Sequence, residues 1–207
     1  SFDRLAKYVN AYEQKMIMKR EVIANKGIWT AKKRYILNVY NEEGVDLKEP
    51  KLKIMGIEAV KSSTPAPCRV KIKEALKVIM NKDENALIQF IDDFRKHFKT
   101  LRPEEIAYPR SCNNLTKYSS TKDIYLKGCP IHVRGALLYN HMLKKKRLSK
   151  YQQIHDGDKI KFVYLRTPNP IHENVIAFPQ EMPKELGLHE YIDYDLQFEK
   201  SFYTSQT

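Results

Sequence analysis

The sequence contains little glycine, few cysteines and no long apolar segment. Only 7 of its 207 residues are glycine, and neither G-x-x-x-x-G-K-[ST] nor G-x-G-x-x-G occurs, so a glycine-rich phosphate loop is not predicted. Cys68, Cys112 and Cys129 form an odd set without close pairing, which indicates a reducing compartment and structural cysteines. No apolar run approaches the ~20 residues that a membrane-spanning helix needs. The first residues do not resemble a signal peptide and read like the middle of a longer protein.

Arrangements of residues that carry catalysis are also missing. No serine lies in a nucleophile elbow, and carboxylate pairs such as Asp92-Asp93 are adjacent in sequence, so their side chains diverge on a helix or strand. Cys129 and His132 would supply only half of a structural zinc site, which normally has two close-spaced ligand pairs. Asp156-Gly157-Asp158 is interpreted as a turn rather than as a metal-binding pair. We therefore predict no active site and no metal site in this chain.

Positive charge is abundant and unevenly distributed. The formal net charge is +12, and residues 61–180 carry 23 basic and 11 acidic side chains, whereas residues 181–207 carry 2 and 6. This asymmetry suits a polyanionic partner, with nucleic acid as the first candidate and an anionic membrane surface as the second. A lysine-rich surface that only maintains solubility is the alternative.

The spacing of apolar residues predicts an α+β fold. The first part has a predicted helix at residues 2–14 and strands at 16–23, 30–40 and 51–57, with turns at 25–27 and 41–44. The second part has predicted helices at 67–80, 87–101, 130–142 and 190–202, a strand at 159–165 and an irregular region at 103–127. A change of structure at residues 62–67 separates a small antiparallel sheet, residues 1–63, from a mostly helical domain with a few short strands, residues 64–207.

The densest positive charge of the first part is Lys32-Lys33-Arg34-Tyr35. If these residues lie in a strand, the pleat places Lys33 and Tyr35 on one face and Lys32 and Arg34 on the other. Paired cations on one face can neutralise phosphates, and a lysine beside an aromatic ring can lie against a groove edge. A solvated edge strand protected by lysines is an equally good interpretation.

A second basic cluster, Lys144-Lys145-Lys146-Arg147, follows the helix predicted at 130–142. These cations could stabilise the negative end of the helix dipole. Alternatively, they could form one wall of a basic channel, and the pattern alone does not decide between the two.

Three segments make the sequence similar to a known family. WTAKKRYILNVY, EPKLKIMGIEAVKSSTP and CPIHVRGALLYN resemble the replicative family B DNA polymerases of T-even-type bacteriophages. The resemblance covers essentially the whole chain in matching order. It implies that residues 1–63 are the end of the palm and that residues 64–207 are the thumb, which grips the product duplex.

The resemblance also implies which residues contact DNA. Lys33 corresponds to a lysine that reaches the minor-groove edge near the newly formed base pair, and Tyr35 supports it. Lys51 and Lys53 follow on the DNA-facing side of the next strand, and the segment from His132 to Gly135 belongs to the thumb's grip. The full predicted DNA-binding set is Lys32, Lys33, Arg34, Tyr35, Lys51, Lys53, His132, Arg134, Gly135, Lys144, Lys145 and Lys146.

Motifs that hold the two catalytic metals in this family are absent. Neither D-x-x-S-L-Y-P nor D-T-D-S occurs in the sequence, and phosphoryl transfer by the two-metal route needs those carboxylates. The resemblance thus implies a chain that is catalytically silent alone and holds no cofactor, with Mg²⁺ belonging to the parent polymerase.

The partners implied by the resemblance are primer–template double-stranded DNA and the remaining polymerase domains, in the cytoplasm of an infected host cell. Those domains would lie either in the same polypeptide or on the catalytic subunit of a split polymerase. No membrane partner is implied, and Ser201–Thr207 does not resemble the apolar peptide that docks on a sliding clamp. Outside the family, the alternative is a free-standing, non-specific DNA-binding protein.

Overall fold

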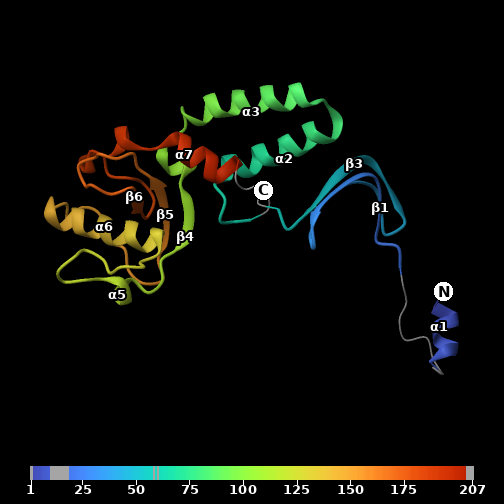
Figure 1. Ribbon diagram of the computed structural model, residues 1–207, viewed down its shortest axis with the longest axis horizontal. Helices are drawn as coiled ribbons and strands as arrows, with labels where there is room; N and C mark the ends of the chain where they lie inside the picture. The colour runs from blue at the N-terminus through green and yellow to red at the C-terminus, as the bar shows by residue number, and fades with distance from the viewer. Residues whose placement is uncertain (1, 10–18, 58, 60, 204–207) are drawn as a thin grey trace. The chain divides into compact units, whose positions relative to one another are not determined.

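Two compact units, Ser1–Gly56 and Ile57–Thr207, make up the chain (Figure 1). The computed structural model describes residues 2–9, 19–57, 59 and 61–203. Each unit contains a three-stranded antiparallel sheet, and most of the helices belong to the second. The predicted α+β class is confirmed. The boundary at Gly56 and Ile57 lies a few residues before the change of structure predicted at 62–67.

The first unit consists of a short helix and a sheet of consecutive hairpins. Its elements are α1 (Phe2–Tyr8), β1 (Val22–Ala31), β2 (Arg34–Glu42) and β3 (Val45–Met55). The strands lie in the order β1-β2-β3, and Ile36 and Val39 of the central strand are buried. Residues 10–18, which include the end of the predicted first helix and the start of the predicted first strand, lie outside the described residues.

The first hairpin turns at a different place from the one predicted. β1 runs straight through Asn25-Lys26-Gly27, where a register shift accommodates one extra residue and Asn38 Nδ2 donates to Asn25 Oδ1 at 2.8 Å. A β-bulge of this kind tolerates turn-forming residues inside a strand. The chain instead reverses at Lys32 and Lys33, between the last residue of β1 and the first of β2. The prediction that residues 30–40 form one strand is therefore wrong for these two lysines.

The second hairpin turns at Glu43 and Gly44, within the predicted reversal at 41–44. Both residues have positive φ, 52° and 90° respectively, and Glu42 pairs directly with Val45. A two-residue loop with positive φ at both positions matches the right-handed twist of the flanking strands. This turn was predicted correctly because glycine is the residue that adopts such a φ without strain.

The second unit is built from helices around a second sheet. Its elements are α2 (Ala66–Asn81), α3 (Glu84–Phe98), α4 (Pro103–Ile106), β4 (Tyr108–Ser111), α5 (Leu115–Tyr118), α6 (Ile131–Lys145), β5 (Lys159–Tyr164), β6 (Val175–Phe178), the 3-10 helices η2 (Lys184–Leu186) and η3 (His189–Tyr191), α7 (Tyr194–Phe198) and the π-helical segment η4 (Glu199–Tyr203). The predicted helices at 67–80, 87–101 and 130–142 and the strand at 159–165 are confirmed within a few residues. Strands β4 and β6 were not predicted.

An aromatic cluster joins α3 to the C-terminal helices. The Phe94 ring lies 5.6 Å from that of Phe198 and 5.0 Å from that of Phe202, measured between centroids, and Phe98 lies 5.3 Å from Phe198. All four rings are buried. Buried aromatic pairs in tilted or edge-to-face geometry stabilise a core beyond the effect of the area they bury. The helical spacing of these residues in α3 was predicted, whereas the single helix predicted at 190–202 is divided into η3, α7 and η4.

Helix α6 covers the second sheet, whose strand order is β4-β5-β6. The two backbones lie close together at Gly135, where an added Cβ would lie 2.9 Å from the backbone nitrogen of Ala177 and 3.1 Å from the carbonyl carbon of Ile176. Only glycine allows backbones to approach so closely. Gly135 is therefore a packing position between helix and strand.

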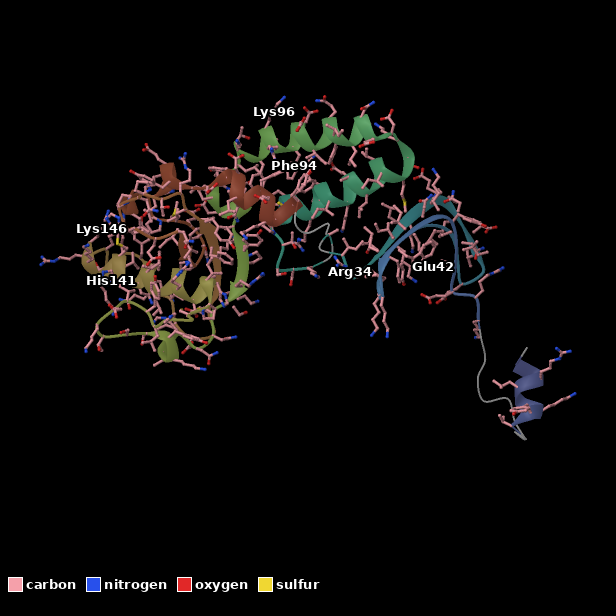
Figure 2. All side chains as sticks on the ribbon, viewed as in Figure 1. Arg34, Glu42, Phe94, Lys96, His141 and Lys146 are labelled. Carbon is pink, nitrogen blue, oxygen red and sulfur yellow. The ribbon has the colours of Figure 1, made fainter. Side chains whose placement is uncertain are left out.

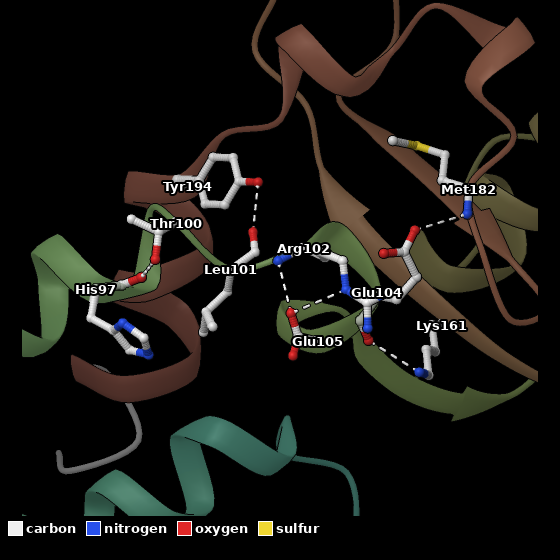
Figure 3. Close-up of polar contacts among 9 residues, drawn as sticks. All are labelled: His97, Thr100, Leu101, Arg102, Glu104, Glu105, Lys161, Met182 and Tyr194. Carbon is white, nitrogen blue, oxygen red and sulfur yellow. Dashed lines mark hydrogen bonds and ion pairs between the residues drawn. The ribbon is translucent and has the colours of Figure 1, made fainter.

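Short polar contacts fix the chain between α3 and β4, within the region predicted to be irregular (Figure 3). Glu105 Oε2 accepts from the Arg102 backbone at 3.0 Å at the start of α4, and Glu104 Oε1 accepts from the Met182 backbone at 3.2 Å. Lys161 Nζ donates to the Glu104 carbonyl at 3.0 Å, and Tyr194 donates to the Leu101 carbonyl at 3.0 Å. These bonds join four separate segments of the second unit.

Candidate nucleic-acid interface

The first predicted DNA-binding cluster lies at the tip of a hairpin. Lys32 and Lys33 are exposed turn residues, and Lys33 has a φ of 63°. A positive φ is uncommon for a residue other than glycine, asparagine or aspartate, and it persists only where the surrounding structure imposes it. The predicted division of Lys32 and Lys33 between two faces of a strand is therefore wrong, because a turn does not follow the pleat.

Gly56 packs against the backbone of this turn. A Cβ on Gly56 would lie 2.4 Å from the Lys33 carbonyl oxygen and 3.0 Å from Cγ of Arg34, and Gly56 itself has a φ of 67°. The backbone of Lys33 thus packs directly against the backbone at the end of β3. This contact fixes the position from which the Lys33 side chain projects.

Arg34 and Tyr35 begin β2 and are partly buried. Tyr35 pairs with Trp29 on β1 and with Met55 on β3, so the three side chains share one face of the sheet. Trp29 is 70% exposed and Met55 is 45% exposed. Of these three residues only Tyr35 was included in the predicted site, whereas the exposed side chains of Trp29 and Met55 beside the lysine turn were not. The only signal for it was the WTAKKRY segment itself, in which the tryptophan lies just upstream of the lysines.

Lys51 and Lys53 are both engaged in ion pairs within the first unit. Lys51 pairs with Glu42 and Lys53 with Glu21. The hydrogen bond from Lys51 holds the pKa of Glu42 below its usual value, and the hydrogen bond to Glu21 raises the pKa of Lys53. Each lysine therefore has a carboxylate partner in the free chain, and its net field is weaker than that of Lys32 or Lys33.

The predicted residues of the second unit occupy the two ends of α6. His132 is half-buried near its start, and burial, followed by the nearby Arg110 guanidinium, lowers the pKa of this histidine. Arg134 donates from Nη2 to Asn174 Oδ1 at 2.5 Å and lies 5.7 Å from the Tyr125 ring centroid. Gly135 is buried against β6.

The lysines at the other end of α6 differ from one another. Lys144 and Lys145 are exposed in the last turn of the helix. Lys146 Nζ donates to the backbone oxygens of Glu185 at 2.7 Å and Leu186 at 3.3 Å, so it ties the helix end to η2. Figure 2 shows Lys146 beside His141 at this end of α6. At 15 residues, α6 is roughly 20 Å long, so these lysines and His132 cannot contact the same phosphate.

The predicted site residues are divided between the two units. In the first unit, Lys32 to Tyr35 lie at the hairpin tip, and Lys51 and Lys53 lie on β3. In the second unit, His132 to Gly135 lie near the start of α6, and Lys144 to Lys146 lie at its end. Across the described residues no cluster of three or more histidine, cysteine or carboxylate side chains is suited to hold a metal ion, and none of their helices is both long and apolar enough to cross a membrane.

The sequence matches two curated phage proteins. The chain is 35% identical to the DNA-directed DNA polymerase of Enterobacteria phage T4, over 98% of its own length and 23% of that protein. It is 37% identical to the DNA-directed DNA polymerase of Escherichia phage RB69, over 97% of its own length and 23% of that protein. The chain resembles a segment of a T-even phage DNA polymerase. No protein-family model matches it.

The resemblance stated from the sequence segments is thereby confirmed. The chain spans about a quarter of the length of these T-even polymerases, and nearly all of it aligns with them. The names palm and thumb, and the contact roles of individual residues, stay predictions.

Proposed function

We propose that this chain binds primer–template duplex DNA as the palm-end and thumb part of a DNA-directed DNA polymerase in viral DNA replication. The observation that carries the proposal is the match of nearly the whole chain to two phage DNA polymerases at 35% and 37% identity. In this assignment residues 1–63 complete the palm and residues 64–207 form the thumb.

The hairpin tip is the proposed contact with the newly formed base pair. Two exposed lysines on a turn whose backbone packs against Gly56 present their ammonium groups from a fixed position. Lys33 would donate to acceptors in the minor groove, whose pattern is nearly the same for A·T and T·A pairs and varies little between sequences. A polymerase must tolerate every sequence, so a minor-groove donor suits its task.

Phosphate contacts supply the rest of the proposed affinity. Lys144 and Lys145 are exposed at the end of α6, and residues 61–180 carry the excess of basic side chains. Each phosphate that such cations neutralise releases counterions, so the affinity falls as salt rises. The proposed binding is therefore weak, non-specific and strongly salt-dependent.

Catalysis is assigned to other parts of the polymerase. The two aspartate motifs of the family do not occur in this sequence, and none of the described residues fits a magnesium site. Mg²⁺ and the reacting carboxylates would come from the remaining domains, either in the same polypeptide or on a split catalytic subunit. The proposed location is the cytoplasm of the infected cell.

Two measurements on the purified chain test this function. Fluorescence anisotropy with a duplex of about 20 base pairs should show binding that weakens at least tenfold between low and moderate salt, with little preference among sequences. A primer-extension assay with Mg²⁺ and nucleotides should show no incorporation, and addition of a polypeptide that carries the aspartate motifs should restore it. Incorporation by the chain alone would overturn the assignment. Strong preference for one sequence would favour the free-standing DNA-binding protein.

Substitutions at the hairpin tip refine the same test. In a polymerase that contains this segment, Lys33→Ala should slow primer extension. The expected decrease in rate corresponds to a loss of about 1–3 kcal/mol of transition-state stabilisation. Lys32→Ala is the matched control, because it removes the same charge from the neighbouring turn position and should act only through general electrostatics. Tyr35→Phe should be milder than Tyr35→Ala if ring packing matters more than the hydroxyl. Equal losses for the two lysine variants would mean that the tip is a diffuse basic surface.

A further inference from the structure

A loop with three exposed lysines connects β4 to α6 in the second unit. We call residues 113–129 the lysine loop, because Lys117, Lys122 and Lys127 are exposed and Asp123 is the only acidic residue in this part of the sequence. None of the three lysines belongs to the predicted DNA-binding set. Like charges along a flexible segment repel one another and favour extended, variable conformations. The contacts that hold this loop therefore determine how its lysines are presented.

The beginning of the lysine loop is attached to Asp156. The backbone nitrogen of Leu115 donates to Asp156 Oδ1 at 2.6 Å, and Thr116 Oγ1 donates to Asp156 Oδ2 at 3.1 Å. The bond from Leu115 is the main reason why the pKa of Asp156 lies below its usual value. Both oxygens of this carboxylate thus accept donors from the loop.

The end of the lysine loop is attached to Glu173, which lies on the connection between β5 and β6. The Tyr125 hydroxyl donates to Glu173 Oε1, and both residues are half-buried. This bond, followed by burial, raises the pKa of Tyr125, because it favours the protonated phenol that donates. Next to Tyr125, the backbone nitrogen of Leu126 donates to the Tyr118 carbonyl oxygen at 2.9 Å, which joins the two halves of the loop.

Glu173 is itself held in place by a buried asparagine. Asn169 Nδ2 donates to the Glu173 carbonyl oxygen at 2.6 Å, and Asn169 Oδ1 accepts from the Glu173 backbone nitrogen at 3.4 Å. Arg134 adds a contact from α6, because its guanidinium lies 5.7 Å from the Tyr125 ring centroid and donates to Asn174. Tyr125 therefore meets an acceptor whose backbone is already fixed, which reduces the loss of conformational entropy when the two groups join.

A carboxylate beside a basic loop is unfavourable for the attraction of a polyanion. Each negative charge there repels phosphate groups and weakens the general electrostatic attraction. The bond between Glu173 and Tyr125 offsets this effect if it orders the loop before the partner arrives, since a preorganised loop loses less conformational freedom on binding.

We propose that Glu173 is a positioning residue that acts through Tyr125 to order the lysine loop before duplex DNA binds, with Asp156 as the anchor at the other end of the loop. Glu173 itself contacts no nucleic acid in this arrangement. The inference deepens the proposed function and rests on it for the identity of the partner.

The first measurement is amide hydrogen exchange in the full chain without DNA. Tyr125→Phe and Glu173→Ala should each accelerate exchange at Leu126, while the paired amides of β5 and β6 keep their native rates. Glu173→Gln should restore slow exchange, because a side-chain amide oxygen also accepts from a hydroxyl. Native exchange rates at Leu126 in both Tyr125→Phe and Glu173→Ala would overturn the inference.

The second measurement is the affinity of the same variants for a duplex at one salt concentration. Loss of a negative charge alone should strengthen binding, whereas loss of the anchor should weaken it. Glu173→Ala should therefore bind roughly threefold to tenfold more weakly than the native chain, the range expected for one hydrogen bond. Tyr125→Phe should change affinity in the same direction, and Glu173→Gln should bind at least as tightly as the native chain. Urea midpoints should be the same for all of these proteins, which separates positioning from a general loss of stability.

Asp123→Asn is the matched control for charge. Asp123 is exposed in the same loop, and within the described chain its side chain has no hydrogen-bond or ion-pair partner. This variant should bind slightly more tightly than the native chain. If Glu173→Ala also binds more tightly, Glu173 acts only as a charge, and the inference fails while the proposed function stands. If the native chain binds no duplex, the proposed function fails, and the exchange rates alone decide whether Glu173 orders the loop.

Discussion

The interactions that stabilise the first unit differ from those that stabilise the second. In the first unit the strands are neighbours in sequence and the described ion pairs of Lys51 and Lys53 lie at the surface of the sheet. In the second unit, side chains about 100 residues apart in the sequence share one buried cluster, as Phe94 and Phe198 do. Surface ion pairs contribute little to stability, whereas buried aromatic rings contribute a great deal. We therefore expect the first unit to depend on its turns and the second on its core.

The largest expected effect is at Phe94, which is buried and labelled in Figure 2. Phe94→Ala removes a ring that contacts three other phenylalanines and should destabilise the second unit by about 3–5 kcal/mol. Urea denaturation, with amide resonances of both units recorded, measures the effect. The resonances of β1 to β3 should be unchanged, and Ile88→Ala, at an exposed position on α3, serves as control. Simultaneous unfolding of both units would contradict the expectation that the two units depend on different interactions.

The turn that presents Lys33 should be sensitive to Gly56. Gly56→Ala adds a Cβ 2.4 Å from the Lys33 carbonyl oxygen at a φ of 67°, so backbone strain on the order of 1–3 kcal/mol is joined by a steric clash. Gly44→Ala is a matched control, because Gly44 also has a positive φ but its Cβ would meet nothing within 4 Å. Denaturation followed through Trp29 fluorescence should show a clearly larger loss for Gly56→Ala. Equal losses would mean that the contact with Lys33 does not matter.

Gly135 tests the helix-to-sheet contact of the second unit. Gly135→Ala places a Cβ within 3.2 Å of three atoms of Ile176 and Ala177, two of them backbone atoms, which cannot move like a flexible side chain. Overpacking of this kind should cost about 1–3 kcal/mol. His141→Ala, on the exposed side of the same helix, should cost much less. If Gly135→Ala keeps full stability but loses affinity for duplex DNA, the predicted contact role of Gly135 is favoured over packing.

The smallest expected effect concerns the response of the second unit to acid. Burial and then Arg110 lower the pKa of His132 below its ordinary value of 6.5. The unfolded chain therefore binds a proton at His132 at a higher pH than the folded chain, and stability declines as the pH falls through about 6.5. His132→Gln should reduce this decline between pH 7.5 and 5.5, measured by urea midpoints. His141→Gln is the exposed control, and an unchanged decline in His132→Gln would exclude this origin.

Much of the fold was predictable because local patterns and tertiary structure agree. The helical spacing of Phe94 and Phe98 predicted α3, and both residues are buried. Glu43-Gly44 was predicted as a turn, and the structure has the required positive φ at both residues. The interpretation of Asp156-Gly157-Asp158 as a turn is also confirmed, because Asp156 and Gly157 form a turn in which Gly157 has a φ of 89°.

What failed depended on contacts that are distant in sequence. Lys32 and Lys33 are not residues that favour turns. The turn they form packs against Gly56, which lies more than 20 residues later in the sequence. β6 is a buried strand of four residues, too short for periodicity to reveal.

The aromatic cluster sets a condition on the order in which the molecule can be completed during translation. Phe94 and Phe98 leave the ribosome about 100 residues before Phe198 and Phe202, with which they pack. At synthesis rates of roughly 5–20 residues per second, Phe94 and Phe98 wait for about 5–20 seconds without the rings of Phe198 and Phe202 that pack against them. The first sheet has no such delay, since each of its strands pairs with the one synthesised just before it. A nascent chain stalled before residue 198 should therefore be a better substrate for chaperones than the released chain, although its hairpins are already formed.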